Sequence, residues 1–399
     1  MKVDKIVIVG CGIIGKLAKA CLEKDQINIY AFFDSNKQKQ GGSFLNEKIL
    51  TEEELVSLDT DTLFLVAHNY FNSTKSFLNN KNFHNVDDCI KIFNKIDLDE
   101  IKIEFNEYDT QNFRREVDWY TVDTKKERSQ DESFLQLKCI DIMITEKCSM
   151  KCKDCANLMQ YYVRPENADL KILFNSLDNL MTAIDHLYEF RVLGGEPFMN
   201  KEINKIINKL LSYKNFSNIV IYSNATIVPK NENLMCLKND KIAVEITNYG
   251  ESLSRNHEKV VETYKGNNIK FRTKGPGEWT ESGKLKFYKR TPEELQRTFD
   301  NCCVKNTTTL LDGILYRCPF AANATKLKAI PLISEEVVDL KKAGSAKENR
   351  ENFKKFFHNN KPIKACTFCG GRDYSTEKIK AAIQTKESVP YKIHSQYES

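Results

Sequence analysis

Three cysteines behind a predicted buried strand are the feature that most constrains this chain. The apolar run CIDIMIT predicts a strand at 139–145. The motif CSMKCKDC follows directly and places Cys148, Cys152 and Cys155 on a loop at a strand's carboxyl end, where parallel barrels carry their chemistry. Three thiolates can hold three irons of a 4Fe-4S cluster and leave the fourth iron open for catalysis. A structural zinc site is the alternative, but no further His or Cys stands close by in sequence.

The CxxxCxxC spacing resembles the signature of the radical S-adenosylmethionine (SAM) superfamily, and a second motif agrees with it. The segment RVLGGEPFMN matches the family's GGEP motif through Gly194, Gly195 and Glu196. The resemblance implies that Glu196 accepts a hydrogen bond from the methionine ammonium of SAM, while the two glycines let the backbone approach the ligand. Ser223 and Asn224, in IYSNAT, match positions that contact the ribose. The implied cofactors are therefore a 4Fe-4S cluster and SAM.

The resemblance also implies the first chemical step. A reduced cluster donates one electron to SAM, and the resulting 5′-deoxyadenosyl radical abstracts hydrogen from an unactivated carbon. One departure from the family pattern is Asp154, because the residue before the third cysteine is usually aromatic and packs near the adenine. Adenine contacts are then expected from the backbone, Tyr161 or Tyr162. Arg272 is either a partner for the methionine carboxylate or a solvated side chain at a strand end.

A second group of five cysteines lies late in the chain. They are Cys302, Cys303, Cys318, Cys366 and Cys369. A G-x4-C arrangement followed by CTFCGG resembles the auxiliary-cluster domain called SPASM and its shortened form, Twitch. The full pattern has seven cysteines, so five fit one additional 4Fe-4S cluster, held by the last three and by either Cys302 or Cys303. A four-cysteine zinc site is the alternative. Full ligation by the protein would make the cluster an electron conduit.

A glycine loop near the N-terminus predicts a nucleotide site. GCGIIG, with Gly10, Gly12 and Gly15, joins a predicted strand to a helix, and Asp34 ends the next strand. This is the context of a dinucleotide fingerprint, in which the helix N-terminus holds phosphates and the acid binds ribose hydroxyls. The segment FFDSNKQKQGGSFLNEKIL resembles Rossmann-like domains of bacterial sugar acetyltransferases, which bind nucleotide-sugars. A nucleotide-sugar or other nucleotide is expected, and a nicotinamide dinucleotide or a vestigial or interaction role remains open.

Alternating strand and helix signals predict an α/β chain with three folded domains, a linker and a tail. The expected parts are a Rossmann-like nucleotide-binding domain at 1–95, a polar linker at 96–137, a partial (β/α)6 radical SAM barrel at 138–275, a small α+β Twitch/SPASM-like domain at 276–375 and a polar tail at 376–399. The composition of the tail predicts partial disorder.

Charge and hydropathy exclude some partners. Lys and Arg number 60 against 55 Asp and Glu, and the two signs are interspersed, so we expect no nucleic-acid partner and no membrane-surface role. No segment holds the ~20 apolar residues that cross a bilayer, and the N-terminal apolar run lacks a cleavage site. A soluble cytoplasmic protein is expected.

The company of domains predicts the substrate class. We expect an oxidoreductase or epimerase that acts on a small carbohydrate or nucleotide-sugar and receives electrons from a donor such as flavodoxin or ferredoxin. The main alternative is a radical SAM maturase of a ribosomally made peptide, although such enzymes usually begin with a winged-helix module. The second alternative is a non-catalytic iron-sulfur and nucleotide-binding sensor. The sequence identifies no catalytic acid or base.

Overall fold

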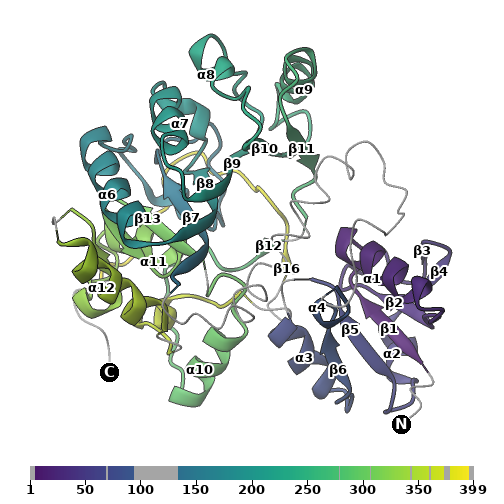
Figure 1. The fold of residues 1–399 in the computed structure, drawn as a ribbon. Helices are drawn as coiled ribbons and strands as arrows, with labels where there is room; N and C mark the ends of the chain where they lie inside the picture. Colours follow the sequence, from purple (N-terminus) through teal and green to yellow (C-terminus); the bar gives the residue numbers. More distant parts are fainter. Residues whose placement is uncertain are drawn as a thin grey trace. The chain divides into compact units, whose positions relative to one another are not determined.

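The chain folds into two compact units, drawn in Figure 1. The first lies within residues 1–129, and the second comprises 130–372 and 376–399. The computed structural model describes residues 5–68, 71–93, 134–277, 279–305, 307–341, 344–358, 361–372 and 378–394. The predicted linker therefore lies outside the described residues up to position 133.

A six-stranded sheet forms the first unit. Its strands are β1 (Ile6–Val9), β2 (Ala31–Phe33), β3 (Ser43–Phe44), β4 (Glu47–Leu50), β5 (Leu63–Val66) and β6 (Val86–Asp88), in the order β3-β4-β2-β1-β5-β6. Only the β3–β4 pair is antiparallel. The described helices are α1 (Ile13–Lys24), α2 (Glu52–Val56), α3 (Phe71–Asn79) and α4 (Ile90–Phe93). Alternate residues of β1, such as Val7 and Ile8, enter two different apolar clusters, so both faces of the sheet are covered, as parallel sheets require.

An open eight-stranded sheet forms the second unit. Its strands are β7 (Gln136–Met143), β8 (His186–Leu193), β9 (Phe216–Ser223), β10 (Ile242–Thr247), β11 (Phe271–Lys274), β13 (Thr308–Leu311), β14 (Ile314–Tyr316) and β15 (Val338–Asp339). The order is β11-β10-β9-β8-β7-β13-β14-β15, with β14 and β15 antiparallel to their neighbours and the other strands parallel.

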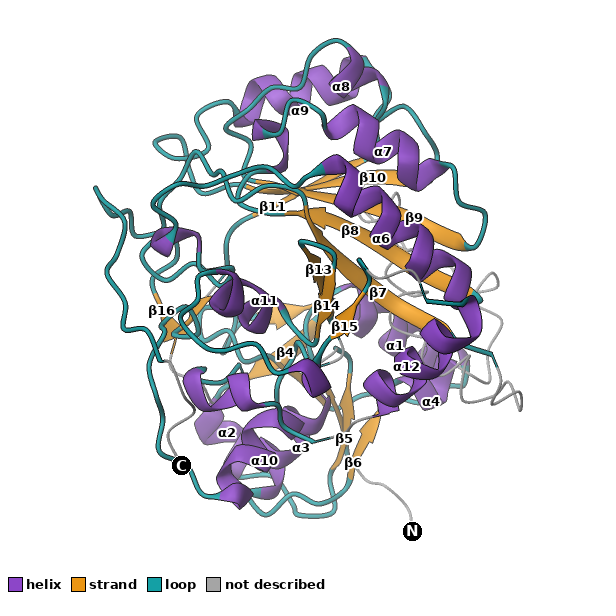
Figure 2. Cartoon of the chain, turned by 90° about the vertical axis from the view of Figure 1, so that its left-hand side faces the viewer, coloured by secondary structure: helices purple, strands orange, loops and turns teal. Residues whose placement is uncertain are grey.

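Helices cover one face of this sheet, as Figure 2 shows for α6 and α7. The α-helices of the unit are α6 (Leu170–Ala183), α7 (Ile203–Leu211), α8 (Glu232–Met235), α9 (His257–Gly266), α10 (Pro292–Asp300), α11 (Pro319–Lys326) and α12 (Ala346–His358). Single-turn 3-10 helices are η2 (Met159–Tyr161), η3 (Pro197–Met199), η4 (Ser334–Glu336) and η5 (Lys364–Phe368). Ile140, Ile142 and Val192 pack with Leu177 and Ile206 of these helices in one apolar core.

The strand residues between these core positions carry charge. Side chains alternate between the faces of a strand, so Asp141, between Ile140 and Ile142, points away from the helices. Asp141 and Arg191 instead line a cavity at the carboxyl ends of the strands. The sheet thus separates an apolar, helix-covered face from a polar face.

The predicted α/β class with parallel sheets is confirmed, and the sheet of the second unit is open rather than a closed barrel. β13 pairs in parallel with β7, so part of the predicted region 276–375 continues the same sheet as 138–275. None of the described helices combines the length and apolar character needed to cross a membrane.

The C-terminal segment is held in place by pairing that its polar composition does not reveal. β16 (Lys378–Ile379) pairs antiparallel with β12 (Trp279–Thr280). Farther along, Thr385 N donates to Lys151 O at 2.8 Å, and Lys153 N donates to Ile383 O at 2.7 Å. The polar sequence at 376–399 therefore contains an ordered part, described from 378 to 394, that lies against the first cysteine loop.

Candidate active site

The loops after β7 and β8 pack so tightly that two glycines are required. Gly195 N donates to Thr145 O at 2.9 Å, and Glu196 N donates to Lys147 O at 2.8 Å. A Cβ on Gly195 would lie 2.3 Å from Lys147 O and 2.7 Å from the Cβ of Cys148, and one on Gly194 would lie 2.2 Å from Thr145 O. The sequence predicts that these glycines let the backbone approach a ligand, and both do line the cavity described next. The structure adds that they make room for the loop after β7.

This packing brings the first three cysteines to one cavity. Cys148, Cys152 and Cys155 line a cavity of about 360 Å³, together with Gly194, Gly195, Ser223 and Asn224. Burial raises the pKa of all three thiols, that of Cys152 to about 11, and the charge of Cys155 raises the pKa of the other two further. A bound cation favours the thiolate form and offsets this cost, so the donor set fits a cationic iron centre.

Glu196 connects the second motif to the third. Its carboxylate is fully buried and accepts hydrogen bonds from Ser223 Oγ at 3.0 Å, Asn224 N at 2.7 Å and Phe198 N at 3.2 Å. Burial outweighs these bonds and raises the pKa of Glu196 to about 7. The structure therefore brings Glu196, Ser223 and Asn224 together. Glu196 ties the two loops to each other, and Asn224 Nδ2 lies 3.7 Å from Cys148 Sγ.

Tyr161 and Tyr162, which the sequence offers as adenine contacts, do not line this cavity. Tyr161 donates its hydroxyl to Gly283 O at 3.1 Å and Tyr162 donates to Asn323 Oδ1 at 2.8 Å, so both hydroxyls are used within the fold. Tyr249 and Trp279 line the cavity instead, edge to face with ring centroids 6.1 Å apart. These two residues become neighbours only through the fold.

Charged side chains form the polar end of the same cavity. Arg191 Nη1 lies 3.3 Å from Asp141 Oδ1, and Arg191 Nε donates to the Tyr222 hydroxyl at 3.1 Å. Burial raises the pKa of Asp141, and the positive charges of Arg191 and Arg372 oppose that rise. The sequence did offer a signal here, because a lone Asp or Arg in an otherwise apolar strand must find a partner.

Arg272 does not line this cavity. Its Nε lies 3.9 Å from Glu245 Oε2, and Lys274 Nζ lies 3.7 Å from the same oxygen. Burial lowers the pKa of Arg272. Arg272 is partly buried and lies beside the buried Glu245 of the neighbouring strand β10. Its predicted role as a partner for the methionine carboxylate stays a prediction.

The later cysteines gather at a second cavity. Cys302, Cys318, Cys366 and Cys369 line it, whereas Cys303 is exposed and does not. Cys318 is the N-cap residue of α11, and its Sγ accepts a hydrogen bond from Ala321 N at 3.4 Å. Burial raises the pKa of Cys302 to about 12 and of Cys318 to about 11. Within the described residues, no group of three His, Cys, Asp or Glu side chains is arranged to hold a single metal ion.

In the N-terminal glycine loop, the backbone at the end of β1 lies close to the first turn of α1. Gly10 has φ +118°, which favours glycine, and a Cβ on Gly15 would lie 2.1 Å from Gly10 O. Gly12 is the N-cap residue of α1 and has open space around its Cα. Two of the three predicted glycines are therefore needed to bring strand and helix together, and the third, Gly12, has open space beside it.

Asp34 is engaged by its own loop. Its Oδ2 accepts from Cys11 N and from Lys39 Nζ, each at 2.9 Å, and its Oδ1 accepts from Asn36 N at 2.9 Å. Burial by itself would raise the pKa of Asp34, but these hydrogen bonds outweigh it and the net shift is downward. The charged carboxylate thus shapes the glycine loop, and Lys39 places a cation beside it.

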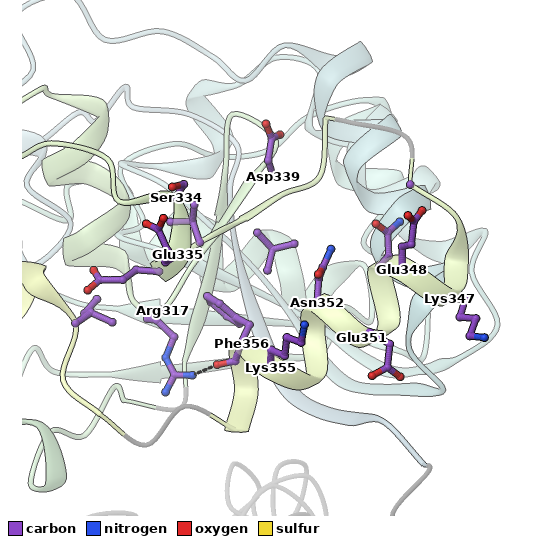
Figure 3. A pocket seen from close by; sticks show the side chains of 16 residues that line it. Arg317, Ser334, Glu335, Asp339, Lys347, Glu348, Glu351, Asn352, Lys355 and Phe356 are labelled. Carbon is purple, nitrogen blue, oxygen red and sulfur yellow. Dashed lines mark hydrogen bonds between the residues drawn. The ribbon is translucent and has the colours of Figure 1, made fainter.

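A larger cavity, of about 750 Å³, lies between η4, β15 and α12 (Figure 3). Its side chains carry mixed charge, and no cysteine lines it. Arg317 lines both this cavity and the second cysteine cavity, and its Nη1 donates to Phe356 O. The clustered cysteines all lie elsewhere, so this cavity is not the candidate active site.

Comparisons with known proteins cover different parts of the chain. A family model described as C2185-like, N-terminal, matches residues 2–87. A GTP 3′,8-cyclase of Clostridium acetobutylicum is 28% identical over 102 residues, covering 25% of this chain and 31% of that protein. One from Helicobacter pylori is 30% identical over 94 residues, covering 23% and 28%. The chain thus spans about a third of these relatives' length.

Two of the solved structures that resemble this chain contain bound AdoMet. That of anSMEcpe with bound AdoMet has 11% identity and a TM-score of 0.37, covering 65% of this chain and 93% of that one. That of BtrN in complex with AdoMet and 2-DOIA has 15% identity and a TM-score of 0.36, covering 63% and 97%. In its cysteine and GGEP motifs and in its sequence relatives, the chain is similar to radical SAM enzymes.

Proposed function

We propose that this chain is a radical SAM enzyme that abstracts hydrogen from a small, polar, carbohydrate-like substrate. One observation carries the proposal: three cysteine thiols share a cavity with buried Asp141 and its partly buried neighbours Arg191 and Tyr222. The thiols would hold the cluster, and the polar groups would hold the substrate. The C2185-like match covers only the N-terminal part and leaves this site untouched.

Cys148, Cys152 and Cys155 would ligate a 4Fe-4S cluster. When bound, the cluster supplies the electron for SAM cleavage at the iron that the protein leaves open. Ser223 and Asn224 line the same cavity and offer hydrogen-bonding groups to SAM. Glu196 holds the loop that carries them, so its carboxylate orients the site from behind.

The polar end of the cavity supports a hydroxyl-rich substrate. The Asp141 carboxylate can accept hydrogen bonds from hydroxyl groups, and the Arg191 guanidinium and Tyr222 hydroxyl can donate them. Buried polar groups of this kind favour a ligand that pairs with them over an apolar one. A carbohydrate or the sugar of a nucleotide-sugar has this chemistry. Oxidation, epimerisation and dehydration all begin with hydrogen abstraction from such a carbon.

The remaining parts have assigned roles in the proposal. Cys302, Cys318, Cys366 and Cys369 would hold a second cluster, and their common cavity favours Cys302 over Cys303 as the fourth ligand. That cluster would exchange electrons with the substrate radical or with a donor such as flavodoxin or ferredoxin. The N-terminal unit would bind a nucleotide-sugar or other nucleotide at its own glycine loop, with Lys39 and the α1 amide groups facing the phosphates.

Anaerobic reconstitution with iron and sulfide tests the proposal. We expect about eight irons per wild-type chain and about four in a Cys148→Ala/Cys152→Ala/Cys155→Ala variant. Dithionite-driven release of 5′-deoxyadenosine should disappear in the same variant. Cys236→Ala is the matched control, because Cys236 is partly buried and its thiol donates to Asn233 O away from both cavities.

The outcomes separate the alternatives. Loaded wild-type protein that forms no 5′-deoxyadenosine would contradict the enzyme and favour an iron-sulfur sensor. Four irons together with one zinc would reduce the second cysteine group to a structural site. Turnover of a peptide but of no sugar would replace the proposed substrate class with that of a peptide maturase.

A further inference from the structure

Arg372 lies in the wall between the two cysteine cavities. Among the residues that line either cavity, Val304 and Arg372 line both, and Arg372 is the charged one of the pair. It follows Cys369 by three residues, so the chain leaves the second cysteine group and immediately places a cation beside the first. The side chain is partly buried.

Arg372 forms one hydrogen bond through its guanidinium, to the first cysteine loop, and another through its backbone carbonyl, to the second cysteine group. Nη2 donates to Ala156 O at 3.0 Å, and Ala156 directly follows Cys155. The carbonyl of Arg372 accepts from Cys303 N at 3.1 Å, in the turn that also carries Cys302. The residue thus connects the first cysteine loop to the second group through two well-formed bonds.

Electrostatics agree with this placement. Burial lowers the pKa of Arg372, but the charges of Cys369, Cys303 and Cys302 outweigh it and the net shift is upward. A guanidinium stays charged throughout the ordinary pH range, so its charge acts on both groups at all times.

We infer that Arg372 is a positioning residue that couples the two iron-sulfur sites, because its single cation raises the reduction potential of the centre held in each cavity. Reduction adds negative charge to a centre already surrounded by thiolates. A cation fixed in the shared, partly buried wall stabilises that charge more than a solvated one would. The inference rests on the proposed function.

The test is a redox titration of the reconstituted full chain without SAM, in which electron paramagnetic resonance monitors the reduction of each cluster. A Cys318→Ala/Cys366→Ala/Cys369→Ala variant assigns the two signals. Arg372→Gln should shift both midpoint potentials downward, and Arg372→Lys, which keeps the charge, should restore most of each shift. Gln and Lys both keep a hydrogen-bond donor, so a shift that Gln causes and Lys reverses reports the charge of Arg372 and not its hydrogen bond.

Arg290→Gln is the matched control. Arg290 Nη1 donates to Cys366 O at 2.9 Å, and Arg290 lines neither cavity. Its loss should leave the first signal unchanged. Cluster-loaded Arg372→Gln protein in which one or both midpoint potentials are unchanged would overturn the inference. An Arg290→Gln variant in which both potentials shift by the same amounts would also overturn it. Either result would leave the proposed function standing. A wild-type chain that assembles no cluster in one cavity overturns both the inference and that part of the proposed function.

Discussion

At the residue scale, the candidate site combines residues of local motifs with residues that only the fold brings close to them. Cys148 and Glu196 belong to local patterns whose chemistry can be recognised one residue at a time. Tyr249 and Trp279 come from separate segments, and their approach to the cysteines depends on long-range strand pairing. Asp141 is an intermediate case, because the sequence shows a charged residue within an apolar strand but does not show that its partner is Arg191.

Gly195 gives a test of the packing between the two loops. Gly195→Ala should lower the free energy of unfolding by about 1–3 kcal/mol, because the added Cβ would meet Lys147 O. Iron loading should fall with it, since the same contact places Cys148. Gly275→Ala is the control, because nothing lies within 4 Å of its added Cβ. Urea unfolding of the metal-free variants measures the difference in their free energy of unfolding. Equal stability of Gly195→Ala and Gly275→Ala would refute the packing argument.

Glu196 gives a pH dependence with a definite sign. Its pKa rises from 4.5 in the unfolded chain to about 7 in the folded one, so the folded state binds the proton more tightly. The stability from this group is present below about pH 4.5 and is lost as the pH rises through about 7. In metal-free protein, wild type should therefore lose more stability than Glu196→Gln between pH 5 and pH 7 by urea titration. Parallel curves would show that Glu196 is not protonated in the fold.

At the element scale, short apolar runs predicted most strands, because strands buried on both faces need little else. Pairing partners were less predictable. β13 joins β7 across more than 160 residues of sequence, as Thr308 opposes Ile140. The C-terminal segment was the least predictable element, since polar side chains gave no sign that its backbone would pair with the first cysteine loop.

Gln384 is the residue through which that segment reaches a cysteine. Its Nε2 donates to Cys152 Sγ at 3.1 Å, and its Oε1 accepts from Lys151 N at 2.8 Å. Gln384→Leu should remove both bonds and make the reconstituted protein lose its visible iron-sulfur absorbance faster in air. Lys386→Ala, at an exposed neighbouring position, is the control. Identical decay of the two variants would mean that the segment does not protect the loop.

At the scale of the whole molecule, the near balance of charge and the absence of long apolar runs argue against nucleic-acid and membrane partners. They do not indicate which reaction the chain catalyses. The chemistry comes from one unit, in which both cysteine groups and the polar cluster belong to the same sheet and its loops. The sequence spaced the two groups far apart and could not show that their cavities share Arg372. Substrate identity is likewise a property of the assembled cavity, not of any motif.

The central claim is that the first cysteine loop holds a cluster with an iron open to SAM. The most direct measurement is electron paramagnetic resonance of the reduced Cys318→Ala/Cys366→Ala/Cys369→Ala variant, with and without SAM. We predict that SAM changes the signal, because its amino and carboxylate groups bind the open iron. A signal that SAM leaves unchanged, in protein carrying a full cluster, would contradict the account.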